Sequence, residues 1–228
     1  MTFAVPPLEP VCLTIAGGDS LFPVARVFCI GRNYADHAIE MGGNPDREEP
    51  FFFAKPATAI VPGGGAIPYP PASHDLHHEV EMVAALEKGG RDIAESDALA
   101  CVFGYAVGID LTRRDLQATA KKAGRPWDMA KGFDASGPVG TLVPAANCTG
   151  IDHAAITLTV NGETRQSGHL NQMIWKTGEA IAYLSRLIEL KPGDLIFTGT
   201  PAGVGALQRG DSLVAEITGL PKLTCTIA

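Results

Sequence analysis

Residues 98–109 read ALACVFGYAVGI, the longest nearly uninterrupted apolar stretch of this 228-residue chain. Asp97 and Asp110 bound it, and its length falls well short of the ~20 residues that cross a bilayer as a helix. A short apolar run between such boundaries is typical of a buried β-strand, which we predict over 102–109.

On both sides of this stretch, short apolar runs between turn-forming residues predict seven further strands. They span residues 26–30, 51–53, 80–86, 156–160, 195–197, 212–217 and 223–227. Asn161-Gly162 follows the alternating run ITLTV and predicts a two-residue hairpin turn, because a type I′ turn needs positive φ at both central positions.

Helical signals are fewer than strand signals. Residues 112–123 predict one helix, with Thr112 as its N-cap and Asp115 at the capping-box position. An amphipathic pattern over about 173–190 predicts a second helix, which ends before a type II turn at 191–194. Because the regular βαβ alternation of a doubly wound sheet is missing, the predicted fold class is α+β, predominantly β, with a few short helices.

The composition excludes several classes of protein. A hydrophobic content of 46% excludes a disordered chain, and a net charge of −7 argues against a nucleic-acid or anionic-membrane surface. The N-terminus has no basic region and contains three early prolines, so we expect no secretory signal and a cytoplasmic location. The five cysteines include no C-x-x-C pair, which favours buried thiols over disulfides or a zinc site.

Glu79 and Glu81 are the first candidate functional residues. They are two positions apart, so in a strand their carboxylates project from the same face and repel each other unless a cation lies between them. A bound metal ion would resolve that conflict. The alternative is a solvent-facing acidic pair on an edge strand.

Asp110 ends the apolar stretch and is a candidate third ligand. The alternative for this residue is a turn or cap just before the helix at Thr112. Three carboxylates without cysteine or paired histidine favour a hard ion, Mg²⁺ or Mn²⁺, over zinc. His77 and His78 adjoin the acidic pair, and we expect them to be loop residues or to support the ligands.

His37 and Glu40 are three residues apart and face the same way on a helical turn. A carboxylate that orients an imidazole makes a general base for activating water, and a surface ion pair is the alternative. The run Gly42–Asp46 follows and predicts a flexible segment that lets this turn close over a substrate.

Two further features have a possible chemical role. Lys131 is flanked by apolar residues and is predicted to point inward at an anionic oxygen, with a surface lysine as the alternative. The run 198–205, TGTPAGVG, offers free backbone N–H groups that can receive a carboxylate, and a tight turn is equally compatible with it.

Taken together, these segments resemble the fumarylacetoacetate hydrolase family, and in particular its small single-domain acylpyruvate and fumarylpyruvate hydrolases. The resemblance begins at about residue 26, so residues 1–25 are expected to be a lead-in to a catalytic domain at 26–228. The matching stretches are GRNYADHAIEM, FFFAKPATAI, DLHHEVEM, FGYAVGIDLTRRDLQ, GRPWDMAKGFD, VNGETRQSG and LIFTGTPAGVG.

The resemblance implies a fold and a site. The family fold is a mostly β, sandwich-like roll that usually forms a homodimer. The family's functional residues match metal ligands Glu79, Glu81 and Asp110, the dyad His37 and Glu40, the active-site Lys131, and the substrate-contacting Arg114, Gln117 and Thr200.

The implied reaction is metal-dependent hydrolysis of a 2,4-dioxo acid to pyruvate and a carboxylic acid, with Mg²⁺ or Mn²⁺ as cofactor. The expected substrate is fumarylpyruvate, from aromatic-acid catabolism, and Arg32, Arg113 and Arg114 are candidates for holding its distal carboxylate. Oxaloacetate decarboxylation or an isomerase activity is the enzymatic alternative. A non-catalytic metal or oxo-acid binding protein is the alternative from another functional class.

Overall fold

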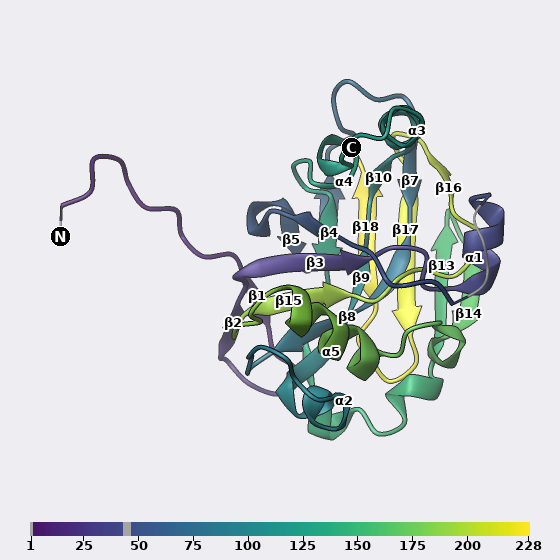
Figure 1. The fold of residues 1–228 in the computed structure, drawn as a ribbon. Coiled ribbons are helices and arrows are strands. Elements are labelled where there is room, and N and C mark those ends of the chain that lie inside the picture. The colour runs from purple at the N-terminus through teal and green to yellow at the C-terminus, as the bar shows by residue number, and fades with distance from the viewer. Residues whose placement is uncertain (1, 43–46) are drawn as a thin grey trace.

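The computed structural model describes residues 2–42 and 47–228 (Figure 1). Its largest sheet contains the strand at 102–109 and has the order β4-β3-β15-β8-β9-β11-β5, with β12 also paired to β9. In chain order, these strands are β3 (Arg26–Ile30), β4 (Phe52–Lys55), β5 (Ile60–Pro62), β8 (Val80–Leu86), β9 (Val102–Ile109), β11 (Gly137–Val139), β12 (Val143–Pro144) and β15 (Asp194–Phe197).

A five-stranded sheet of order β14-β13-β17-β18-β6 packs against the first. Its strands are β6 (Gly65–Ile67), β13 (Ala155–Val160), β14 (Glu163–His169), β17 (Ser212–Ile217) and β18 (Leu223–Ile227). In Figure 1, the yellow β17 and β18 run upright, and β3 crosses them nearly horizontally. Burial alternates along β13, β17 and β18, as expected for strands with one face toward a core.

The central strand β8 is buried along its whole length because it lies between two apolar cores. Met82 and Ala84 join the larger core, which also contains the inner face of the five-stranded sheet. Val83 and Ala85 point the other way, into a second core closed by the strand pair β1 (Cys12–Thr14) and β2 (Leu21–Pro23). The segment before β1 extends away from the body (Figure 1), and the predicted domain boundary at residue 25 stays a prediction.

A three-stranded sheet has the order β10-β7-β16, with β7 (Leu76–His78), β10 (Thr112–Arg113) and β16 (Gly205–Leu207). The helices are α1 (Ala35–Glu40), α2 (Glu95–Ala98), α3 (Arg114–Lys122), α4 (Asp128–Lys131) and α5 (Thr177–Leu187). Single 3₁₀ turns lie at Ala57–Ala59, Leu99–Cys101, Ala145–Asn147, Ile151–His153 and Leu170–Gln172. Among the described residues, no helix is both long and apolar enough to cross a membrane.

The predicted fold class is confirmed, and all eight predicted strands are found. Five strands have the predicted bounds, and β4, β13 and β15 differ by one or two residues at their ends. Asn161 and Gly162 both have positive φ and join β13 to β14 as predicted. All five cysteines are free, and three of them are buried.

The predicted cap of the first helix is wrong. Thr112 belongs to β10, where it pairs with His77, and its hydroxyl donates to the carbonyl of Asp110. Asp115 instead accepts hydrogen bonds from the hydroxyl of Ser73 and the N–H of His74, so α3 begins at Arg114. The carboxylate at the capping-box position bonds a neighbouring loop and the N–H of Leu116 in the first turn of α3, and not the N–H of Thr112.

The second predicted helix starts later than expected. The residues before α5 are held extended by Asn33, whose backbone carbonyl accepts the N–H of Ile174 and whose Oδ1 accepts the N–H of Trp175. Backbone groups bonded to another segment cannot also form the first turn of a helix, so α5 begins at Thr177.

Candidate active site

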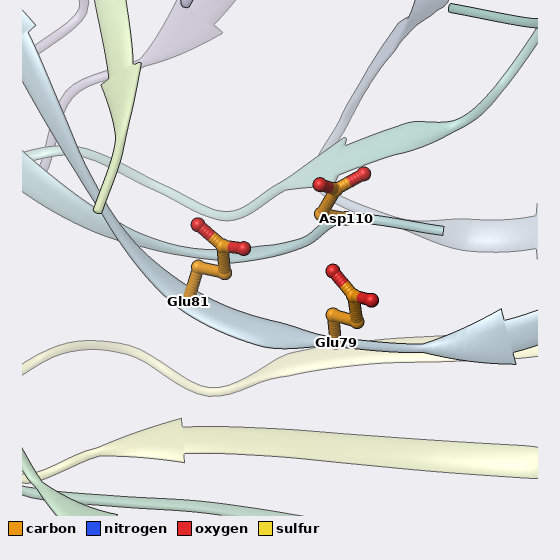
Figure 2. A group of neighbouring side chains, drawn as sticks. All are labelled: Glu79, Glu81 and Asp110. Carbon is orange, nitrogen blue, oxygen red and sulfur yellow. The ribbon is translucent and has the colours of Figure 1, made fainter. Parts of the chain in front are cut away.

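The three candidate carboxylates meet because of the register between β8 and β9. Val80 lies opposite Ile109 and Glu81 opposite Gly108, so Glu79 lies opposite Asp110, whose N–H donates to the Glu79 carbonyl. Alternate residues share a face of a sheet, which directs all three side chains to the same side. Figure 2 shows the three carboxylates directed into one space, with ligand atoms that all lie within 4.8 Å of one another.

Two buried lysines neutralise part of this charge. Lys131 ends α4 and is 2% exposed, and its Nζ lies 2.7 Å from Glu79 Oε2 and 2.7 Å from Asp110 Oδ2. Lys55 ends β4, and its Nζ lies 2.8 Å from Asp110 Oδ1 as an ion pair that lacks hydrogen-bond alignment. Lys55 also donates to the Lys131 carbonyl and to Ser136 Oγ, so it holds the turn that carries Lys131.

The three carboxylates are not electrically equivalent. Burial acts to raise the pKa of Glu79, but the charges of Lys131 and Arg114 outweigh it and hold that pKa well below its usual range. Burial, together with the charges of Asp110 and Glu79, raises the pKa of Glu81 well above the usual range. Burial lowers the pKa of Lys131, but the two carboxylates that it contacts raise it further, so this lysine is charged.

This donor set fits a divalent cation. All three groups offer carboxylate oxygens, the donors that hard ions prefer. Asp110 Oδ1 is buried and accepts no hydrogen bond, and the Glu81 carboxylate accepts only the N–H of Gly199 among the described residues. A cation held by Glu79, Glu81 and Asp110 would supply the positive charge that Glu81 lacks.

His37 lines the pocket from α1, and Glu40 lies on the same helix. His37 is buried, and its Nδ1 lies 3.2 Å from Glu40 Oε2. The position of α1 is fixed by Asn33, whose side-chain amide donates to the carbonyls of Trp175 and Thr198 at 2.8 Å each. Since Nδ1 faces Glu40, Nε2 is the ring nitrogen left for the pocket.

The loop after β15 binds two of the site's carboxylates. The N–H of Gly199 donates to Glu81 Oε2 at 2.6 Å, and the N–H of Gly203 donates to Glu40 Oε1 at 3.0 Å. Both glycines have φ near +95°, which L side chains rarely adopt, and a Cβ at Gly199 would collide with Asn33. The predicted carboxylate-binding run therefore receives carboxylates of the protein itself.

One face of α3 supplies the polar wall of the pocket. Arg114 bonds Glu79 Oε1 through Nη2 at 2.6 Å and Gln117 Oε1 through Nη1 at 2.6 Å. Arg114, Gln117, Lys131 and Thr200 all line the pocket together with His37, Glu79 and Glu81. Arg113 does not line this pocket, because its guanidinium packs over the Phe133 ring and donates to the Met129 carbonyl.

A buried glutamine on β14 orients Thr200. Gln166 is fully buried, and its Oε1 faces His78 Nδ1 at 2.8 Å and accepts the N–H of Val80. Its amide nitrogen donates to Thr200 Oγ1 at 2.7 Å and to the Pro201 carbonyl. Because Oγ1 accepts this bond, the hydroxyl proton of Thr200 is free to point into the pocket.

The structure thus brings together all nine residues predicted for the site. His78 lies in β7, not in a loop, and supports the site through Gln166. Lys55 and Gln166 were missed, although Lys55 stands between apolar residues as Lys131 does and the same signal applies to it. The predicted flexible segment Gly42–Asp46 falls largely outside the described residues.

The site combines a carboxylate cluster suited to a divalent cation with a histidine that is bonded to a glutamate and lines the same pocket. This combination is typical of an enzyme active site. Residues 26–228 match the family described as "Fumarylacetoacetate (FAA) hydrolase C-terminal", and the chain belongs to this enzyme family.

Relatives in the family carry different activities in their names. The chain is 43% identical over 198 residues to an oxaloacetate tautomerase from Arabidopsis thaliana, covering 87% of this chain and 88% of the relative. It is 40% identical over 180 residues to a fumarylpyruvate hydrolase from Ralstonia sp., covering 79% and 93%. A crystal structure of fumarylpyruvate hydrolase from Pseudomonas aeruginosa in complex with Mn²⁺ and pyruvate matches with a TM-score of 0.97 at 50% identity, covering 100% and 99%. The expected family fold is confirmed.

Proposed function

We propose that this enzyme is a fumarylpyruvate hydrolase that uses Mg²⁺ or Mn²⁺. The observation that carries the proposal is that His37, bonded to Glu40, lines the same pocket as Lys131 and two carboxylates, Glu79 and Glu81, of the three-carboxylate cluster. The likeness to the Pseudomonas aeruginosa enzyme over the whole chain supports this substrate.

In the proposed reaction, His37 acts as the general base. Glu40 accepts from Nδ1–H, so Nε2 takes one proton from water as the water oxygen attacks the carbonyl distal to the keto acid. The C–C bond next to that carbonyl then breaks, and its electron pair leaves with the pyruvate fragment as an enolate. The proton returns to that carbon, which yields pyruvate and fumarate.

The inner residues stabilise the charge that develops on the pyruvate fragment. Glu79, Glu81 and Asp110 would hold a divalent ion, which supplies Lewis-acid polarisation of the keto-acid oxygens when bound. Lys131, charged and buried between two carboxylates, places an ammonium group where the enolate oxygen forms. Thr200 and Gln117 donate to the substrate carboxylate from the pocket wall.

The second candidate function is oxaloacetate tautomerisation. Relatives with this name match as well as the hydrolases do, at 43% identity for the Escherichia coli protein. The carboxylate cluster, Lys131 and His37 suit both reactions, because both reactions need a keto acid held near a base and an enolate that is stabilised.

Replacing His37 separates these functions from simple binding. We expect His37→Ala to lower hydrolysis of fumarylpyruvate by about 10²–10⁴-fold, the usual contribution of a general base, while leaving Mn²⁺ affinity unchanged. Pyruvate release from fumarylpyruvate and acetylpyruvate, loss of the enol absorbance of oxaloacetate, and Mn²⁺ titration measure these activities and the metal affinity. Full activity in this variant, or wild-type turnover of oxaloacetate alone, would overturn the proposal.

Other parts of the expected biology stay predictions from the sequence. They are the homodimer, the cytoplasmic location and the role in aromatic-acid catabolism. Sedimentation velocity of the purified chain tests the homodimer.

A further inference from the structure

Cations gather at the outer end of the pocket, the part lined by Arg32, Lys121 and Trp127. Lys121 is half-buried, and burial together with the charges of Arg32 and Arg114 lowers its pKa. Among the described residues, no carboxylate oxygen lies within 4.0 Å of the Lys121 ammonium or the Arg32 guanidinium, whereas Arg114 is paired with Glu79. Like charges placed this close are costly unless an anion binds between them.

Aromatic rings hold the two cations in place. Lys121 Nζ lies 5.9 Å from the centroid of the Trp127 ring, and the Arg32 guanidinium lies 5.8 Å from that of Phe51. The two rings pack edge to face with centroids 5.3 Å apart. Ring faces attract cations without neutralising their charge, so both groups stay available to an anion.

The helix α3 sets how far this anion lies from the reacting atoms. Arg114, Gln117 and Lys121 share one face of α3, at positions i, i+3 and i+7. Arg114 is fixed at the carboxylate cluster by Glu79, and Lys121 lies two turns further on, about 10 Å along the axis at 1.5 Å per residue. A ligand that spans both ends needs a second anionic group well separated from its keto-acid group.

We propose that Lys121, with Arg32 beside it, binds the distal carboxylate of a long-chain dicarboxylic acylpyruvate and so determines the enzyme's specificity. This inference rests on the proposed function and refines it. A substrate such as acetylpyruvate, which ends in a methyl group, makes no use of Lys121. Oxaloacetate, with its two carboxylates close together on a four-carbon chain, does not reach from the inner carboxylates to Lys121.

The test compares substrates that differ in the distal carboxylate. We expect Lys121→Met to raise the KM for fumarylpyruvate at least about tenfold, because a charge-assisted hydrogen bond is lost. The KM for acetylpyruvate should stay within about twofold of the wild-type value. Lys121→Arg should restore most of the affinity for fumarylpyruvate. As a readout independent of turnover, Lys121→Met should weaken competitive inhibition by fumarate by a similar factor.

Lys122→Met is the matched control, because Lys122 is the adjacent lysine, is exposed and does not line the pocket. This control substitution should leave the KM for fumarylpyruvate and the KM for acetylpyruvate unchanged. If Lys121→Met raised the KM for fumarylpyruvate and for acetylpyruvate by the same factor, or raised neither, this inference would be overturned while the hydrolase proposal stands. A wild-type enzyme that cleaves neither acylpyruvate would instead overturn the proposed function, and this inference with it.

Discussion

The inner and outer ends of the pocket are built in opposite ways. At the inner end, Lys55 and Lys131 are buried and paired with the carboxylates around them. At the outer end, Lys121 and Arg32 are half-buried and are paired with no described carboxylate. Buried ion pairs hold the carboxylates and lysines of the inner end in fixed positions. Cations without a paired carboxylate are free to bind an anionic group of the substrate. In the proposed reaction, the inner end carries out catalysis and the outer end determines specificity.

The largest expected effect comes from breaking the inner end. Asp110→Ala removes one of the two carboxylates paired with Lys131 and the carboxylate paired with Lys55, so we expect the free energy of unfolding to fall by about 3–5 kcal/mol and metal-dependent activity to disappear. Urea unfolding with chelator, alongside the activity assay, measures both.

Asp152→Ala is the control for that variant, since the Asp152 side chain is 71% exposed and forms an ion pair with the equally exposed His153. It should unfold within about 0.5 kcal/mol of the wild-type protein, as surface substitutions usually do. If Asp110→Ala matched this control in stability, the inner charges would not depend on one another as described.

The raised pKa of Glu81 predicts how pH affects the inner end. Without metal, the folded protein keeps a proton on Glu81 above the ordinary carboxyl range, and an ion bound to this carboxylate displaces the proton. We therefore expect Mn²⁺ binding to release a proton, and the affinity to fall by up to about tenfold for each unit of pH below the raised pKa. Calorimetric titration in two buffers of different ionisation enthalpy counts the proton, and identical heats in both would contradict the prediction.

The smallest expected effect concerns the glutamine that orients Thr200. Gln166→Glu keeps the acceptor for His78 and Val80 but removes the N–H donated to Thr200 Oγ1, so the hydroxyl turns toward the introduced carboxylate and away from the substrate. We expect the KM to rise by up to about tenfold, the size of one neutral hydrogen bond, with little change in kcat.

A double variant shows whether this effect passes through Thr200. In a Thr200→Val background, Gln166→Glu should add almost nothing to the KM, because the hydroxyl that it reorients is already gone. Additive effects of the two substitutions would mean that Gln166 acts by another route.

The sequence predicts the site better where its residues are close together in the chain. The spacing of His37 and Glu40 and of Glu79 and Glu81 is read directly from helix and strand periodicity, and Asp110 follows from the end of an apolar strand. Gln166 lies on β14 in the five-stranded sheet and reaches Thr200 in the loop after β15, and no local sequence pattern indicates that contact. The misplaced cap at Asp115 has the same origin, because a tertiary partner, the loop at Ser73, competes for its carboxylate.

The loop 198–205 has a consequence for how this enzyme tolerates change. Gly199 holds a carboxylate of the inner cluster and Gly203 holds the partner of the base, so the short stretch of backbone between them sets their separation. An insertion or deletion between these glycines would keep every residue of the carboxylate cluster and of the His37–Glu40 pair. It would change the distance between the two groups. We expect such a variant to bind the ion and the keto acid but to lose turnover, because His37 would no longer lie where it can deprotonate the attacking water.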